Sequence, residues 1–336
     1  MHFHLYYITA ITFLTTKCSG KNAQKNSKNF IEGNDFSKLF SFLRKQIAIY
    51  SVLRYNRRRN KEREFTMVTY AVQPLTPHIT QLTDPAGVHM FLAVGTKQAV
   101  LVDTGVGFYG LREALAGLTT LPISVILTHF HGDHTGGSAL FDRVYLHSAD
   151  IPMASDFTVQ MRKTYTESYA PPNTFIQPEE YVPQYQGAYL PLADGQCFEL
   201  GGITLQIIHV PGHSPGSCCV LFREDRTILF GDACNSNTLL LWDGSISSYR
   251  SSLEHLKQFE DSFDMVLYSH GACAVGPRQT LDDNIELCDR ILRGEDSKLP
   301  CSFMGTNGLR AVAVGPGLLR TDGKHGNIVY REEFRR

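Results

Sequence analysis

The sequence contains no run of about 18 apolar residues, the length that a helix needs to cross a membrane. We therefore expect no membrane span. Residues 5–14 are apolar, but no lysine or arginine precedes them and no small-x-small cleavage site follows, so they do not fit a secretory signal. Lys17, directly before Cys18, does not fit a lipoprotein signal either.

Net charge is almost absent as well, at a formal −1, but this balance hides two opposite parts. Residues 1–66 hold 13 Lys+Arg and 4 Asp+Glu, a net of +9, which leaves 19 and 29, a net of −10, for residues 67–336. Because phosphate backbones attract basic surfaces, we expect no nucleic acid as the partner of the acidic part. The overall composition, 43 % apolar and 19 % charged, is that of an ordinary soluble globular protein.

A disulfide framework is also missing, although the chain has eight cysteines. Two of them, Cys218 and Cys219, are adjacent in an apolar stretch, and no Cys-x-x-Cys pair occurs among the later ones. Buried reduced thiols favour a reducing compartment, so the expected location is cytoplasmic. The other cysteines considered are Cys197, Cys234, Cys273, Cys288 and Cys301.

Residues 1–66 differ from the rest and are predicted to be a basic N-terminal extension outside the fold. They include an Asn/Lys/Ser-rich stretch at 21–29 and a basic run at 54–63. Such runs are usually solvated tails, although they can bind nucleic acid or anionic lipid. We expect a single folded domain at 67–336, with Met67 as a candidate start and the extension dispensable.

The most informative segment is THFHGDHTGG at 128–137. His129 and His131 are two apart, so in extended chain they face the same way, while Asp133 and His134 follow on a turn. Glycines in the string allow a sharp turn and a close approach of the backbone. This density of ligand side chains predicts a site for two metal ions.

Strands and helices alternate from residue 67 onward, which predicts an α/β fold with the string at the end of a strand. Ligand sites in such folds lie at the carboxyl ends of strands. In the first half we expect strands at 88–94, 98–102 and 123–127 and a helix at 111–118. In the second half we expect strands at 203–210, 218–222, 227–230 and 265–268 and a helix at 249–259.

The pattern strand, Asp, helix, strand, His occurs twice. Asp103 and His129 in the first half match Asp232 and His270 in the second. Two such halves packed face to face would bring both sets of strand ends to one rim. We therefore predict an αββα sandwich of two mixed sheets flanked by helices, with a further helix along 281–292 and closing strands at 309–314 and 327–330.

From about Met67 to its end, the chain resembles the metallo-β-lactamase-fold metallohydrolase superfamily. The resemblance rests on an Asp after an early strand, the H-x-H-x-D-H string, and a later His, Asp and His in the family order. It implies that His129, His131 and His213 bind one ion. It also implies that Asp133, His134 and His270 bind a second ion and that Asp232 bridges the two.

The cofactors implied are two divalent metal ions, zinc foremost, with iron or manganese as alternatives. A metal-bridged hydroxide would attack the substrate. Asp133 and Asp103 are the candidate catalytic carboxylates. Asp133 would accept the water's proton or only bind metal, and Asp103 would orient a ligand.

The substrate implied is a small molecule: an ester, a thioester or a lactone. Asp232 at the bridging position disfavours antibiotic β-lactams, and THFHGDHTGG resembles the string of glyoxalase II and the acyl-homoserine lactonases. Flavin-coupled diiron relatives usually carry Glu at the position of His131. The alternatives left open are a phosphodiesterase or nuclease of the same fold and a mononuclear iron, dioxygenase-like redox protein.

The segment between the string and His213 is the expected place for substrate contacts, with packing as the equal alternative. His147 and His209 are expected to be structural. The sequence leaves the oligomeric state open. The aromatic and basic candidates for substrate contact are Tyr165, Tyr169, Tyr181, Tyr185, Tyr189, Arg162, Lys163 and Trp242.

Overall fold

The protein is described by a computed structural model that covers residues 68–242 and 244–336. The chain divides into two units, Met1–Phe65 and Thr66–Arg336, and every described residue belongs to the second. The predicted extension and the candidate start at Met67 lie outside the described residues. No described helix has the length and apolarity that a membrane crossing requires.

The first sheet has seven strands in sequence order, antiparallel from β1 to β4 and parallel from β4 to β7. Its central strands are buried almost throughout, as expected of strands covered on both faces. The strands are β1 (Ala71–Pro74), β2 (Ile79–Thr83), β3 (His89–Val94), β4 (Ala99–Val102), β5 (Ile123–Ile126), β6 (Val144–His147) and β7 (Leu190–Leu192).

The second sheet has six strands in the order β14-β13-β11-β10-β9-β8. Only β11 and β13 are parallel. The predicted internal repeat is therefore present, because β4 and β5 form the corresponding parallel pair in the first sheet. The strands are β8 (Cys197–Glu199), β9 (Thr204–His209), β10 (Cys218–Phe222), β11 (Thr227–Leu229), β13 (Met265–Leu267) and β14 (Val275–Gly276).

A third sheet of four strands, in the order β12-β17-β16-β15, was not predicted. The expected closing strands belong to it rather than to the two large sheets. Its β15–β16 hairpin has a two-residue turn, Met304–Gly305, in which both residues have positive φ (45° and 80°). This is the turn that hairpins favour, but Met-Gly is a weak signal for it. The strands are β12 (Thr238–Leu240), β15 (Leu299–Phe303), β16 (Thr306–Arg310) and β17 (Ile328–Tyr330).

Helix α7 starts earlier than predicted because Ser245 and Ser248 form a capping box at its beginning. Helix α8 carries the predicted apolar stripe and ends at Gly294, which has the left-handed conformation typical of this position (φ 74°). The helices are α4 (Leu111–Ala116), α5 (Gly132–Thr135), α6 (Val159–Tyr169), α7 (Ile246–Lys257) and α8 (Thr280–Arg293). Short 3-10 helices lie at Ser138–Leu140, Ile151–Met153, Pro178–Glu180, Glu260–Ser262, Pro316–Leu318 and Glu332–Phe334.

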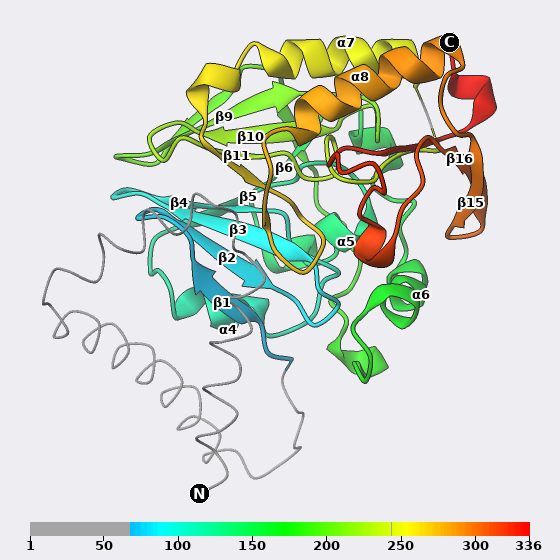
Figure 1. Ribbon diagram of the computed structural model, residues 1–336. Coiled ribbons are helices and arrows are strands. Elements are labelled where there is room, and N and C mark those ends of the chain that lie inside the picture. Colours follow the sequence, from blue (N-terminus) through cyan, green and yellow to red (C-terminus); the bar gives the residue numbers. More distant parts are fainter. Residues whose placement is uncertain (1–67, 243) are drawn as a thin grey trace, which may run out of the picture. The chain divides into compact units, whose positions relative to one another are not determined.

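These elements form the predicted αββα sandwich, with α7 and α8 over the second sheet and α4 under the first (Figure 1). One apolar cluster lies between the two sheets and joins residues such as Phe91 and Val102 to Val220 and Leu229. A second joins α7 and α8 to the second sheet, and a third joins α4 to the first sheet. The sandwich brings the ends of β4, β5, β11 and β13 to one rim, where the candidate site lies.

Candidate metal centre

The string begins just after β5 and turns into the short helix α5. His131 is the last extended residue before this helix (φ −64°, ψ 148°), and Asp133 and His134 lie within it. The turn depends on glycine at position 136. A Cβ there would lie 2.1 Å from the carbonyl oxygen of Val106, so any other side chain would collide with the backbone.

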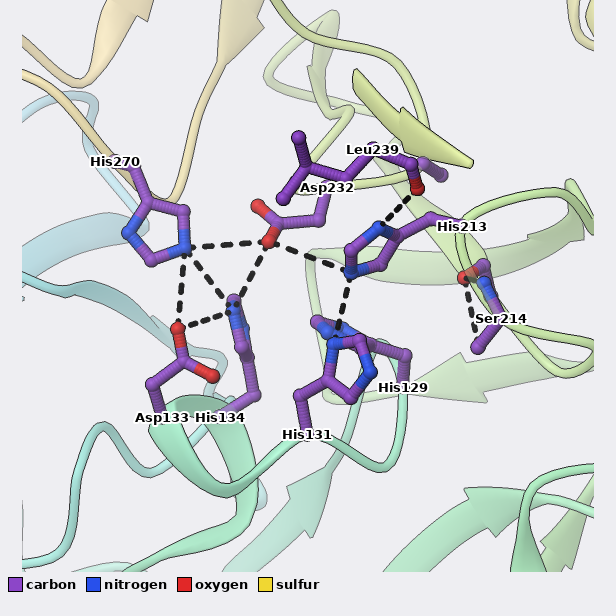
Figure 2. Close-up of polar contacts among 12 residues, drawn as sticks. His129, His131, Asp133, His134, His213, Ser214, Asp232, Leu239 and His270 are labelled. Atoms are coloured by element: carbon purple, nitrogen blue, oxygen red, sulfur yellow. Dashed lines mark hydrogen bonds and ion pairs between the residues drawn. The ribbon is translucent and has the colours of Figure 1, made fainter. Parts of the chain in front are cut away.

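All seven predicted ligands come together at this rim (Figure 2). They form three overlapping groups, and the ligand atoms within each group lie within 4.8 Å of one another. The sequence therefore identified residues that meet in space from both halves of the chain. The groups are His129, His131 and His213; His129, His134 and Asp232; and Asp133, His134 and His270.

Asp232 lies between the other ligands. Its Oδ2 atom is 3.3 Å from Nε2 of His270, 3.5 Å from Nε2 of His134 and 3.7 Å from Nε2 of His213. On the two sides of Asp232, the imidazoles also approach in pairs. Nε2 of His213 is 2.9 Å from Nδ1 of His131, and Nε2 of His134 is 3.2 Å from Nε2 of His270. This is the arrangement that a bridging carboxylate would have.

Two buried polar atoms of the cluster have no hydrogen-bond partner among the described residues: Nε2 of His129 and Oδ1 of Asp232. A buried polar atom without a partner is costly, by about 1–3 kcal/mol. Both atoms carry lone pairs, and imidazole nitrogen with carboxylate oxygen is a donor set for zinc, iron or manganese. The residues present therefore fit a divalent metal ion.

Two ligand histidines are oriented by partners behind them. Nδ1 of His213 donates to the carbonyl oxygen of Leu239 at 2.9 Å, which directs its Nε2 lone pair toward the cluster (Figure 2). Nδ1 of His134 donates to Oδ2 of Asp103, also at 2.9 Å. Such partners fix the tautomer and the ring orientation of a metal-binding histidine.

Asp103 is fully buried and is held in the left-handed region (φ 62°). Its carboxylate accepts from the backbone N–H of Thr128 at 2.8 Å and from the Thr128 hydroxyl at 2.9 Å, besides His134. The geometry thus gives Asp103 the predicted orienting place behind a ligand. Asp103 is fully buried and contacts the cluster through His134.

Burial and charge favour the unprotonated, metal-binding form of His129, His131 and Asp232, but not of His134. Burial, assisted by the neighbouring imidazoles, lowers the pKa of both His129 and His131 well below the usual value. For Asp232, burial alone would raise the pKa, but His270 and His134 outweigh it and hold the pKa well below its usual value. For His134, burial would lower the pKa, but the nearby carboxylates, led by Asp133, raise it well above the usual value.

Of the aromatic and basic candidates, Trp242 and Tyr165 reach the ligands. The Trp242 ring stands edge-on to His131, with centroids 5.0 Å apart, and to His213, with centroids 5.8 Å apart. Tyr165 lies beside the carboxylates of Asp133 and Asp232. Burial, with the charges of Asp133 and Asp232, raises the pKa of Tyr165 well above its usual value.

Other candidates prove to be packing residues. Tyr181 is buried against Phe108, with ring centroids 5.0 Å apart, and Tyr185 packs against Tyr189 at 4.8 Å. Arg162 is buried and bonded to backbone carbonyls rather than facing a substrate. Among the remaining candidates, Tyr169 stacks on Phe303 and Lys163 lies 5.7 Å from the centre of the Tyr181 ring.

Sequence reasoning missed Asp150, a buried carboxylate three residues beyond β6. It accepts hydrogen bonds from the backbone N–H of Phe130, within the string, and from the hydroxyl of Ser214, next to His213. A second oxygen accepts from the N–H of Gly216 at 2.6 Å. The available signal was its position after the strand that pairs in parallel with β5.

Comparisons with known proteins agree with this geometry. A family model described as the metallo-beta-lactamase superfamily matches residues 83–270, which include all seven predicted ligands. The human acyl-coenzyme A thioesterase MBLAC2 is 32 % identical over 191 residues, covering 52 % of this chain and 68 % of that protein. An atrochrysone carboxyl ACP thioesterase of Aspergillus novofumigatus is 29 % identical over 189 residues, covering 55 % and 46 %.

The fold has solved counterparts too. A metallo-beta-lactamase from Pontibacter korlensis superposes with a TM-score of 0.50 at 18 % identity, over 66 % of this chain and 99 % of its own. At this identity the likeness concerns the fold alone.

Proposed function

The chain belongs to the metallo-beta-lactamase superfamily and is a hydrolase, and from that premise we propose that it cleaves a small-molecule acyl thioester with two divalent metal ions. The observation that carries the proposal is the placement of Asp232 between two sets of ligand side chains. Among the ester, thioester and lactone that the sequence left open, the thioester is favoured because similar proteins are named thioesterases.

The ligand assignment follows the groups that the structure brings together. His129, His131 and His213 would hold one ion, and Asp133, His134 and His270 the other. Asp232 would contact both. Nε2 of His129 and Oδ1 of Asp232 have no hydrogen-bond partner among the described residues, and each would gain a metal ion as its partner, which supports this assignment. We propose zinc, while iron and manganese suit the same donors.

When bound, such ions polarise a carbonyl group and lower the pKa of water from about 15.7 toward about 7, which is the chemistry that thioester hydrolysis requires. The residues of the chain prepare the site for it. Asp103 and the carbonyl of Leu239 hold His134 and His213 with their Nε2 atoms turned inward. Oδ2 of Asp133, 3.5 Å from Nε2 of His270, is placed to bind an ion or to accept a proton.

A substrate panel tests the proposal directly. Purified protein loaded with zinc or manganese would be offered an acyl thioester, a lactone, a phosphodiester and a β-lactam, and the zinc content would be measured. We expect about two ions per chain and the highest kcat/KM on the thioester. The Asp232→Ala variant is the matched control, and its thioester turnover should vanish while its fold remains. Faster cleavage of the phosphodiester, or a single bound iron, would contradict the proposal.

We also propose a cytoplasmic location and a hydrolase domain at 67–336. The location is supported by the seven cysteines of the described residues, all of which are free thiols, four of them buried. The domain is supported by the family match, which lies wholly inside it. A chain tagged away from both termini should be found in the cytoplasm by fractionation, and recovery with membranes or in a secreted fraction would contradict the location.

A further inference from the structure

Helix α6 lies beside α5, the short helix that carries two of the predicted ligands (Figure 1). It is inserted between β6 and β7 and was not predicted as a helix. Two of its residues, Arg162 and Tyr165, are three positions apart and therefore on the same side of the helix. Both reach toward the ligand-bearing turn.

Arg162 is buried, and within residues 68–242 and 244–336 its guanidinium forms no ion pair with a carboxylate. The guanidinium instead donates to backbone carbonyls of three separate segments. Nη1 donates to Val106 at 2.7 Å, to Gly107 at 3.3 Å and to Gly136 at 3.2 Å, and Nη2 donates to Val182 at 2.6 Å. A buried charge is costly unless it is well hydrogen-bonded, so this arrangement fixes α6 closely against its neighbours.

One of these acceptors, Gly136, is the residue that ends α5. Arg162 thus holds the helix of Asp133 and His134 from its far end. The two helices also touch along the string itself, because a Cβ at Gly132 would lie only 3.0 Å from Cγ of Arg162. Helix α6 therefore contacts the ligand turn both at its first residue, Gly132, and at its end, Gly136.

Tyr165 adds a side-chain contact between α6 and α5. Its ring packs against the apolar cluster formed by Ala86, Val88, Val106, Phe108 and Tyr181. From this support Tyr165 lies beside the carboxylate of Asp133. A hydroxyl in this place can hold a ligand carboxylate from behind, as outer partners in metal sites usually do.

We propose that α6 positions the second metal group, with Arg162 fixing the backbone of α5 and Tyr165 holding the carboxylate of Asp133. This inference rests on the proposed function, because it takes Asp133, His134 and His270 as the ligands of one ion. Tyr165 acts here through Asp133, and Arg162 acts through the backbone of α5, so both are positioning residues.

Metal binding to the full-length, metal-free protein tests the inference. Zinc would be titrated by calorimetry into the wild type and into the Tyr165→Phe and Tyr169→Phe variants. A titration of His270→Ala assigns the binding events, because the event that this variant loses belongs to the second metal group. We expect Tyr165→Phe to weaken that event about 10- to 100-fold, as loss of an outer partner usually does, with the other event unchanged. Tyr169→Phe, which removes a hydroxyl one turn further along the same helix, should bind both ions like the wild type.

The outcomes separate the two proposals. If the wild type binds two ions and Tyr165→Phe binds the second ion equally well, the role of Tyr165 is overturned and the proposed function stands. Wild-type protein without a second event would overturn both. Arg162→Lys provides an independent arm because lysine keeps the charge but loses the planar fork. The Arg162→Lys variant should have a lower Tm and weaker zinc binding at the second metal group. Weaker binding at the first metal group alone would count against the proposal.

Discussion

The carboxylate of Asp150 accepts a hydrogen bond from the hydroxyl of Ser214 at 2.7 Å, although the two residues lie 64 positions apart in the chain. The same oxygen accepts from the backbone N–H of Phe130 at 3.1 Å. Phe130 separates His129 from His131, and Ser214 follows His213. One buried carboxylate thus joins the two loops that carry His129, His131 and His213, the proposed ligands of the first metal ion.

We expect Asp150→Asn to weaken both the fold and the first metal group. Asparagine has only one acceptor oxygen, so at least one buried donor among Phe130, Ser214 and Gly216 would lose its partner. The expected cost is about 1–3 kcal/mol in the free energy of unfolding, measured by urea denaturation. The affinity for zinc at the first metal group, which includes His213, should fall about 10-fold or more.

Asp156→Asn is the matched control, because Asp156 is exposed on the segment that follows Asp150. It should leave both quantities near their wild-type values. An Asp150→Asn protein as stable as the wild type would show that the two loops hold their places without this carboxylate.

Six of the seven candidate ligands could be predicted because their signals are local or repeated, whereas His213 followed from the family resemblance. His129, His131, Asp133 and His134 lie in one short string, and a strand ends just before it. Asp232 and His270 repeat the places of Asp103 and His129 after parallel strands, and the two parallel pairs bring these places together. The alternation of strands and helices, together with this repeat, was sufficient to predict the αββα layers.

The residues that hold the candidate ligands in place could not be predicted, because their hydrogen-bond partners are defined only by the three-dimensional fold. Arg162 bonds to four carbonyls that are identical, as backbone, to any others in the sequence. Asp150 resembles any acidic residue after a strand until Phe130 and Ser214 are brought beside it. The third sheet was not predicted for a related reason: its hairpin turn lacks a strong sequence signal, and β12 pairs with β17, which lies far away in the chain.

Trp242 is expected to set the preference for the acyl group. It lies edge-on to His131 and His213, and 39 % of its surface remains exposed for a substrate to cover. Covering a large apolar side chain contributes about 1.5–3 kcal/mol. Trp242→Ala should therefore lower kcat/KM about tenfold or more for a long or aromatic acyl thioester, with little change for an acetyl thioester.

Trp242→Phe serves as the control because it keeps an apolar ring at this position. Its kcat/KM values should stay close to those of the wild type across the same series of thioesters. An equal loss for acetyl and long acyl thioesters in Trp242→Ala would indicate that the tryptophan supports the histidines rather than the substrate.

The extension is expected to contribute neither to the fold nor to catalysis. A chain that begins at Met67 retains every predicted ligand and every described strand and helix. It should therefore match the full-length chain in Tm, zinc content and thioester turnover. Calorimetry and steady-state kinetics on the two chains measure this. Failure of the shorter chain to fold would show that residues 1–66 take part in the structure.

His147 and His209 stack face to face, with ring centroids 3.9 Å apart and planes at 15°. They stand at the ends of β6 and β9, so the stack joins the two large sheets. Burial, together with the charge of His209, lowers the pKa of His147 from 6.5 to about 4. Its Nδ1 atom also accepts from the N–H of Ala149 at 3.3 Å, a bond that requires the unprotonated ring.

Protonation should therefore destabilise the protein at this stack. Between pH 6.5 and about 4 the unfolded chain binds a proton at His147 that the folded chain does not. Stability from this residue is complete above pH 6.5 and is lost as the pH falls through that window. His147→Phe keeps a ring for the stack but cannot be protonated, so its Tm should fall less steeply than that of the wild type. The exposed His325, replaced by Phe, is the matched control, and parallel Tm curves for wild type and His147→Phe would contradict the prediction.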